Sequence, residues 1–471
     1  MLFPTKQSPV NGRLLRLRQE RLAATCFILG IATNFSMIKS QTILVTSNDF
    51  MKTNSLFFLF VMTAIILSAC QPASGDISFM VFGDPAELSA YQNLVDSFSQ
   101  AHPETQVDVI QIPGQADYRK RLAADLTAGD PADVLLINYR RFAGFANIGA
   151  LEPLGAYLEK SDLIKEADYY PEAINAFKWH GELTCIPQNI SSLVVYYNMD
   201  LFDSAGVPSP ADGWTWDDFL SAAQSLTKDL DGDGVTDQFG AGLEPSLIRL
   251  APFIWQVNGV VVDDDANPTT LTLDLPEDLQ AAEFFVSLQT LHRVVPNAEE
   301  ESSEDSESRF IHGRLAMFFN SRRGVPTYRE SADFDWDVAP LPQKDAQAGI
   351  LHADAYCLPS ASKNKPAAWT FIEYANSVEG QSIIAASGRT VPSLVSVANS
   401  PAFLDPNAKP ANSRVFLDTI PLIRALPIHT NWAEIEEAAS EEIMRAFYGE
   451  ASVNDAMLRA VLRSREYFFE K

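Results

Sequence analysis

The apolar positions between residues 77 and 138 follow two alternating periods. Short apolar runs typical of buried strands occur in ISFMVF, QVDVIQI and ADVLLIN. Between the first two runs, five apolar residues from Leu88 to Phe98 fall on one face of a helix, and residues 117–129 predict a second helix that Gly129 ends. This β-α-β-α-β order predicts an α/β fold with a mostly parallel sheet covered by helices.

Polar residues follow two of these predicted strands at their carboxyl ends. Asp84 follows the first strand, and residues 138–141 follow the third. Ligands of open parallel sheets bind where the strands end and the loops diverge. We therefore expect a binding site at this edge of the sheet.

Helical patterns dominate the chain after residue 202. TWDDFLSAAQSLTKDL predicts an amphipathic helix with Thr215 as its N-cap and Asp218 three residues on. Four later segments also predict helices: DLQAAEFFVSLQTLHRV, KPAAWTFIEYANS, WAEIEEAASEEIMRAFYG and VNDAMLRAVLRSREYFF. The acidic segment 299–308 is interpreted as a solvated loop.

Residues 51–69 have the order of a secretion signal. Lys52 precedes an apolar run from Leu56 to Leu67, and small residues lead to Cys70. LSAC resembles a bacterial lipobox, in which the cysteine is acylated, and 70–75 would be a polar tether. The alternative is a buried core helix. Because a signal is read at the N-terminus, we expect translation to start at Met51, with residues 1–50 a non-native extension.

The net charge of -26 excludes some partners. A surface this negative repels phosphate backbones and anionic lipid heads, so no nucleic acid is expected, and contact with the membrane is expected only through the lipid anchor.

The four cysteines have no CxxC spacing. Zinc and redox sites are therefore not supported. Cys185 and Cys357 could pair across the mature fold, but two independent thiols are the favoured interpretation.

Several segments together resemble the family 1 extracellular solute-binding proteins, receptors of ATP-driven sugar importers that include maltose-binding protein. ADVLLINYRRFAGFANIGALEPLGAYL resembles the family's strand and G-x-L-x-P-L segment. IPQNISSLVVYYNMDLFDSAGVP resembles its hinge-crossing strand, and RFIHGRLAMFFNSRRGVP its F-x-x-G-x-x-A-M signature. TWDDF, FDWDVAPLP and HADAYCLPSASKNKPAAWTFIEYANS follow in the family's order, so that the resemblance covers residues 76–471.

The resemblance implies a two-lobe periplasmic-binding-protein fold of type II, with a ligand cleft between the lobes. Lobe 1 would take 76–186 and 353–395, and lobe 2 would take 187–352 and 396–471. Hinge closure would capture a sugar or oligosaccharide, which an ABC permease would then receive. The protein would be a monomer, anchored by lipid outside the cytoplasmic membrane, with no catalytic residues and no required cofactor.

A sugar site needs short polar side chains for the hydroxyls and flat aromatic rings for the C–H face. Trp432 is the first candidate for a stacking platform, and Trp255, which could equally be a core residue, is the second. The resemblance implies these ligand-binding residues: Asp84, Asn138, Tyr139, Arg140, Arg141, Gln188, Asn189, Ser191, Trp255, Asn258, Asn320, Arg322 and Trp432.

The sequence departs from the maltose-type pattern at the crossing strand, where Ser191 replaces an acid. Arginines occur at 140, 141, 322 and 323. More guanidinium groups and fewer acids would also suit a phosphorylated or acidic solute, such as a glycerol-phosphate-type ligand. That receptor class is therefore an alternative.

The segment DLDGDGVTDQFG predicts a possible structural Ca²⁺ site. Asp229, Asp231, Asp233 and Asp237 stand at positions 1, 3, 5 and 9 of a calcium loop, but Gly240 stands where the bidentate Glu belongs. The alternative is a solvated acidic turn.

Two rival functions are less consistent with the sequence. A secreted glycoside-active enzyme would need paired carboxylates, and neither such a pair nor an HExxH, GxSxG or P-loop motif is found. A surface receptor or adhesion module without an importer is the other rival.

Overall fold

The structure, a computed structural model, describes residues 76–469. Its first sheet has the strand order β2-β1-β3-β11-β6. The strands are β1 (Ile77–Phe82), β2 (Val107–Ile112), β3 (Val134–Asn138), β11 (Asp354–Cys357) and β6 (Cys185–Pro187). β1 pairs in parallel with β2 and β3, whereas β11 runs antiparallel to β3 and β6. The predicted parallel β-α-β-α-β unit is confirmed.

Helix α3 (Pro85–Ala101) follows β1 and buries the predicted apolar face. Asp84 and Glu87 form a capping box at its start. Tyr91, Leu94, Val95 and Phe98 are buried, and Leu88 is partly buried. Helix α4 (Gln115–Ala128) ends at Gly129 in the left-handed conformation, as predicted.

The second sheet has three antiparallel strands in the order β8-β7-β9. They are β7 (Val194–Asn198), β8 (Met317–Asn320) and β9 (Trp336–Ala339). Because side chains alternate along a strand, β7 contributes Val194 and Tyr196 to one apolar core and Val195 and Tyr197 to the other. Both faces of this sheet are therefore covered.

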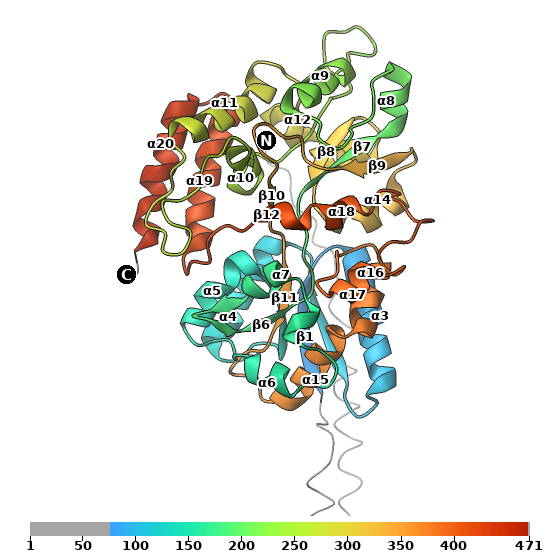
Figure 1. The fold of residues 1–471 in the computed structure, drawn as a ribbon, viewed down its shortest axis with the longest axis vertical. Helices are drawn as coiled ribbons and strands as arrows, with labels where there is room; N and C mark the ends of the chain where they lie inside the picture. The colour runs from blue at the N-terminus through green and yellow to red at the C-terminus, as the bar shows by residue number, and fades with distance from the viewer. Residues whose placement is uncertain (1–75, 470–471) are drawn as a thin grey trace, which may run out of the picture. The chain divides into compact units, whose positions relative to one another are not determined.

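Helices surround the two sheets (Figure 1). The longer ones are α9 (Trp216–Leu226), α10 (Leu247–Gln256), α11 (Pro276–Thr290), α15 (Lys365–Ala375), α19 (Trp432–Phe447) and α20 (Val453–Ser464). The shorter helices are α5 (Tyr139–Asn147), α6 (Gly155–Lys160), α7 (Pro171–Asn175), α8 (Met199–Ala205), α12 (Ala298–Ser303), α13 (Ser306–Ile311), α14 (Val325–Ser331), α16 (Val378–Ala386), α17 (Val395–Ala398) and α18 (Val415–Asp418). The remaining short pieces are β4 (Lys178–Trp179), β5 (Glu182–Leu183), β10 (Gly349–Ile350), β12 (Ile423–Arg424), η1 (Glu166–Asp168), η2 (Arg322–Gly324), η3 (Ile420–Leu422) and η4 (Arg465–Phe468).

The helices predicted in the second half of the chain are confirmed, including the Thr215 cap of α9. The interpretation of 299–308 as a loop is wrong, because α12 and α13 lie there. Asn297 and Asp305 accept hydrogen bonds from the first backbone N–H groups of these helices, so two short capped turns form despite the acidic composition.

The connections between the two sheets lie side by side. Ser191, between β6 and β7, exchanges two backbone hydrogen bonds of 2.8 Å with His352, which precedes β11. Asn189 forms a bridge to Pro392, which lies on a third connection after α16. The chain therefore passes between the sheets through mutually bonded segments, and the exact lobe boundaries given above stay a prediction.

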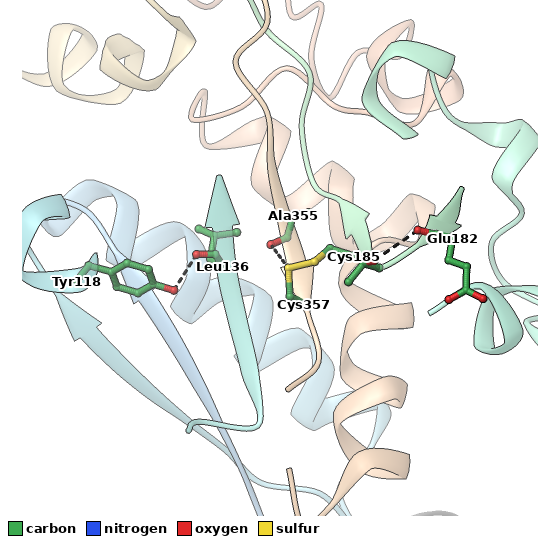
Figure 2. The surroundings of a disulfide bond; sticks show 7 residues. Tyr118, Leu136, Glu182, Cys185, Ala355 and Cys357 are labelled. Carbon is green, nitrogen blue, oxygen red and sulfur yellow. Dashed lines mark hydrogen bonds between the residues drawn. A yellow bond between two sulfur atoms is a disulfide. The ribbon is translucent and has the colours of Figure 1, made fainter. Parts of the chain in front are cut away.

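A disulfide joins Cys185 of β6 to Cys357 of β11 (Figure 2). The two residues are directly opposite in the antiparallel register, with their Cα atoms 4.5 Å apart. The favoured interpretation of two independent thiols is therefore wrong. Sequence spacing did not reveal the pair because 172 positions separate residues that the sheet makes neighbours.

The predicted signal peptide 51–69, the acylated Cys70, the tether and the extension 1–50 lie outside the described residues. Within 76–469, no helix is long and apolar enough to cross a membrane.

Candidate functional site

Three polar side chains converge beside the end of β3. Asn138 caps α5 by accepting from the N–H of Arg140, and its Nδ2 donates to Asp354 Oδ1 at 3.0 Å. Asn189 donates to Asp354 Oδ2 at 3.4 Å and accepts from the Asp354 N–H at 2.9 Å. One carboxylate is thus held by two amides, an arrangement that suits recognition of hydroxyl groups.

Asp84 lies at the neighbouring strand end. One carboxylate oxygen caps α3, and the other accepts from Thr327 Oγ1 of α14 at 3.3 Å. Helix α14 follows β8 of the second sheet, so this bond connects elements of the two sheets. The strand-end position of Asp84 therefore places its side chain against a helix that follows a strand of the second sheet.

Arg140 and Arg141, at the start of α5, both reach Glu436 on α19. Arg140 Nη1 and Arg141 Nη2 donate to Glu436 Oε1, the latter at 3.0 Å. Burial raises the pKa of Glu436, but the two guanidinium groups outweigh it and the net pKa is lowered. The Glu436 carboxylate is therefore charged. It joins α5, which follows strand β3 of the first sheet, to α19, which packs in the core of the second sheet.

Helix α10 places another arginine near enough to Arg140 for their charges to interact. Arg249 lies 3.6 Å from Glu244, whose side chain is 70% exposed. Burial lowers the pKa of Arg249; Glu244 opposes this, while the charges of Arg323 and Arg140 add to it. We call Arg140, Arg141, Arg249 and Glu436 the arginine cluster.

His352 lies on the connection next to this cluster. Burial lowers its pKa well below the usual range, and the charges of Arg249, Arg140 and Arg323 lower it further. The imidazole is therefore neutral at pH 7. It adds a polar group to the site without adding charge.

Other predicted site residues have structural partners. Gln188 donates to the hydroxyls of Tyr356 and Tyr91 inside the first core. The hydroxyl of Ser191 donates to the Ser192 carbonyl.

Asn320 of β8 donates to the hydroxyl of Tyr328 at 2.7 Å and to Glu307 at 3.2 Å. These two polar partners hold its amide beside β8.

Arg322 lies away from the arginine cluster. Its Nε donates to the Gly388 carbonyl and its Nη1 to Ser413 Oγ, both at 3.0 Å. The guanidinium also stands over the rings of Phe403 and Phe416. Burial lowers its pKa to about 9.

The predicted aromatic candidates are buried. Trp432, at the start of α19, is 0% exposed, and Trp255 is 5% exposed. Both side chains belong to the apolar core of the second sheet. Tyr139 is also buried, and its hydroxyl accepts from the Leu426 N–H at 3.2 Å. Asn258 is exposed after the end of α10 and has a positive φ of 62°.

The acidic loop 229–237 brings three of its four predicted ligands together. Carboxylate oxygens of Asp229, Asp231 and Asp237 lie within 4.8 Å of one another. Asp233 is not part of this group, and all four carboxylates accept hydrogen bonds from backbone N–H groups of the loop. Gly240 cannot be replaced by a liganding side chain, because a Cβ there would lie 1.9 Å from the Ala223 carbonyl oxygen.

Sequence reasoning missed Asp354, Glu436, Arg249 and His352. Asp354 and His352 lie in the HADAY segment, where a charge inside an apolar strand could have marked the position. Glu436 is one helical turn after Trp432 and so shares its side of α19. Arg249 carried no such signal.

Comparison with known proteins shows which family the chain resembles. Residues 83–382 match the family described as bacterial extracellular solute-binding protein. A Brucella abortus protein named only as a binding protein is 23% identical over 418 residues, which cover 87% of this chain and 97% of that protein.

Two solved structures share the fold. An ABC substrate-binding protein from Listeria monocytogenes, in complex with cycloalternan, has a TM-score of 0.77 and 24% identity, covering 83% of this chain and 98% of its own. The UgpB protein of Mycobacterium tuberculosis, in complex with glycerophosphocholine, has a TM-score of 0.73 and 22% identity, covering 84% and 98%.

Proposed function

Because the chain belongs to the family of bacterial extracellular solute-binding proteins, whose members are transport receptors and not enzymes, we propose that it captures a carbohydrate between two lobes and delivers it to an ABC permease. The fold is the two-lobe fold of these receptors. The carbohydrate assignment is supported by the cycloalternan-bound relative and by the hydroxyl-binding groups of the site.

One observation carries this proposal. Elements of the two sheets meet through polar side chains: Arg140 and Arg141 contact Glu436, and Thr327 contacts Asp84. Such contacts can break and reform as lobes rotate about bonded connections, which is the hinge motion of periplasmic binding proteins. A solute held by Asp354, Asn138 and Asn189 would be covered when they form.

We further propose that the protein is exported as a monomer and held outside the cytoplasmic membrane by acylation of Cys70. The disulfide supports an oxidising compartment, because such bonds are rare in reducing cytosol. Labelling of cells with a radioactive fatty acid would test the anchor, with Cys70→Ser as the matched control. Label that persists in the variant would exclude this cysteine.

A structural Ca²⁺ is proposed for the acidic loop, where Asp229, Asp231 and Asp237 would supply oxygen ligands. The fit is partial, because Gly240 offers no carboxylate. Calcium at 1 mM is expected to raise the melting temperature by a few degrees, and Asp229→Asn to remove the rise. An equal rise in the variant would contradict the site.

A thermal-shift screen tests the proposed receptor function. Mono- and oligosaccharides, polyols and sugar phosphates are added to the protein, and hits are measured by calorimetry. A binder is expected to be recovered chemically unchanged and to lower the radius of gyration in solution scattering. Turnover of a saccharide, or binding without compaction, would contradict capture by hinge closure.

A further inference from the structure

The arginine cluster holds more positive charge than its carboxylates neutralise. Arg140 and Arg141 share one oxygen of Glu436. Among residues 76–469, the one carboxylate paired with Arg249 is that of Glu244 at 3.6 Å, a distance beyond a hydrogen bond, and most of the Glu244 side chain is in water. The buried carboxylate of Glu436 therefore pairs with Arg140 and Arg141, while Arg249 is left with an exposed carboxylate, and an uncompensated buried charge is costly.

Several polar atoms of this cluster have no hydrogen-bond partner within residues 76–469. Arg140 Nε, Arg141 Nη1 and Arg249 Nε are all buried donors of this kind. The hydroxyl of Ser246, the residue before α10, and one acceptor, Glu436 Oε2, are also buried without a partner. Buried donors normally find acceptors, and the three arginine donors outnumber the one free carboxylate oxygen, so the excess of donors on α5 and α10 points to a ligand that supplies acceptors.

The surplus is local to this cluster. Arg389, on the third connection between the sheets, pairs with the buried carboxylate of Glu87 at 2.5 Å. That arginine needs no outside acceptor for its charge. The charge of Arg389 is thus neutralised by the chain itself, although its Nε has no hydrogen-bond partner among the described residues.

The site thus has two chemically different parts. Asp354, Asn138 and Asn189 suit hydroxyl groups, whereas the arginine cluster presents free N–H donors with positive charge. Guanidinium groups match the geometry of carboxylates and phosphates, which accept two parallel hydrogen bonds.

We infer that the solute is an anionic carbohydrate, and that Arg249, assisted by Arg140, binds its carboxylate or phosphate group. This inference rests on the proposed receptor function and narrows its substrate class. The charge surplus of the cluster is removed when the anion binds. The hydroxyl-binding residues then hold the sugar part of the same molecule.

Matched probes test the inference by calorimetry and thermal shift. Glucose is compared with glucuronate and glucose 6-phosphate, and maltotriose with trigalacturonate. An anionic probe is expected to bind at least tenfold more tightly than its uncharged counterpart, and the preference for glucuronate or glucose 6-phosphate distinguishes carboxylate from phosphate. Arg249→Gln should weaken this probe at least tenfold, and Arg249→Lys should weaken it less.

Arg314→Gln is the control variant, because Arg314 is half-exposed and pairs with Glu304 on the surface. Its affinity should equal that of the unchanged protein. If Arg249→Gln fails to fold, the comparison of matched probes on the unchanged protein decides. Equal binding of charged and uncharged sugars overturns the inference and leaves the receptor function intact. If no sugar binds, charged or uncharged, both the inference and the proposed receptor function are overturned.

Discussion

Two groups of buried arginines in this molecule have opposite surroundings. Arg322 donates two hydrogen bonds to neighbouring groups and stacks on two aromatic rings. The arginine cluster leaves three N–H donors without partners among the described residues. The first arrangement stabilises the fold, and the second keeps donors available for a ligand.

The surroundings of a buried arginine separate a structural role from a ligand-binding one. Arg140, Arg141 and Arg322 were predicted together as ligand-binding residues, and sequence alone offered no difference between them. Burial differs: Arg322 is 1% exposed, whereas the side chains of Arg140, Arg141 and Arg249 are 12–18% exposed. Arg322 leaves one donor, Nη2, without a partner among the described residues, so donor satisfaction alone does not separate the groups. The distinguishing property is that Arg322 is enclosed by fixed neighbours and two aromatic rings, whereas the cluster arginines lie, partly exposed, beside the contact between α5 and α19.

The largest effect on stability is expected for Arg322→Ala, with a loss of about 4 kcal/mol in the free energy of unfolding. The substitution removes the packing against Phe403 and Phe416 and leaves a cavity. Urea denaturation measures the loss, and ligand affinity should stay within threefold. Arg323→Ala is the matched control, because the neighbouring side chain is 43% exposed and should cost less than about 1 kcal/mol. Equal losses in both variants would contradict the assignment.

Removal of the disulfide by the double change Cys185→Ala and Cys357→Ala should cost about 3 kcal/mol. The closed loop spans 172 positions, and its loss frees the unfolded chain. Denaturation under oxidising and reducing conditions checks the value, because the reduced unchanged protein should match the variant. The affinity for solute should not change, since the bond joins β6 to β11 within the first sheet. A large loss of affinity for the solute would show that the disulfide also holds the ligand-binding residues in place.

Glu436→Gln should cost about 2 kcal/mol at pH 7, because Arg140 and Arg141 lose their shared carboxylate. The folded pKa of Glu436 lies below its ordinary value of 4.5. The contribution of the Glu436 carboxylate to the free energy of unfolding is therefore present above about pH 4.5. It is lost as the pH falls through the folded pKa. Denaturation should show that the stability difference between Glu436→Gln and the unchanged protein is smaller at pH 3 than at pH 7. Glu441→Gln, a half-exposed residue on the same helix, should cost less than about 1 kcal/mol at both pH values.

The smallest effect, with the opposite sign, is expected for Arg249→Gln. The fold disfavours the charged form of Arg249, because its pKa is lowered by burial and by nearby arginines. Replacement should leave the stability unchanged or raise it by about 1 kcal/mol, while affinity for an anionic sugar falls. A loss as large as that of Arg322→Ala would make Arg249 a structural residue and remove the contrast between the two regions.

Local patterns predicted much of the fold. The strands before Asp84 and Asn138 and the helix capped by Thr215 follow from apolar periodicity and from capping chemistry. The two short helices in 299–308 were missed, because composition suggested a solvated loop while Asn297 and Asp305 provided caps. The site was predicted only in part, at the strand ends.

The sequence by itself determined the strand and helix positions, the strand-end location of Asp84 and Asn138 and the family resemblance, because these depend on residues near one another in the chain. Only the tertiary structure decided which residues meet across it: Cys185 with Cys357, Arg140 with Glu436, and Asn138 with Asp354. These partners are 172 to 296 positions apart. A side chain's burial and pairing depend on the packing of distant elements, which no local pattern contains.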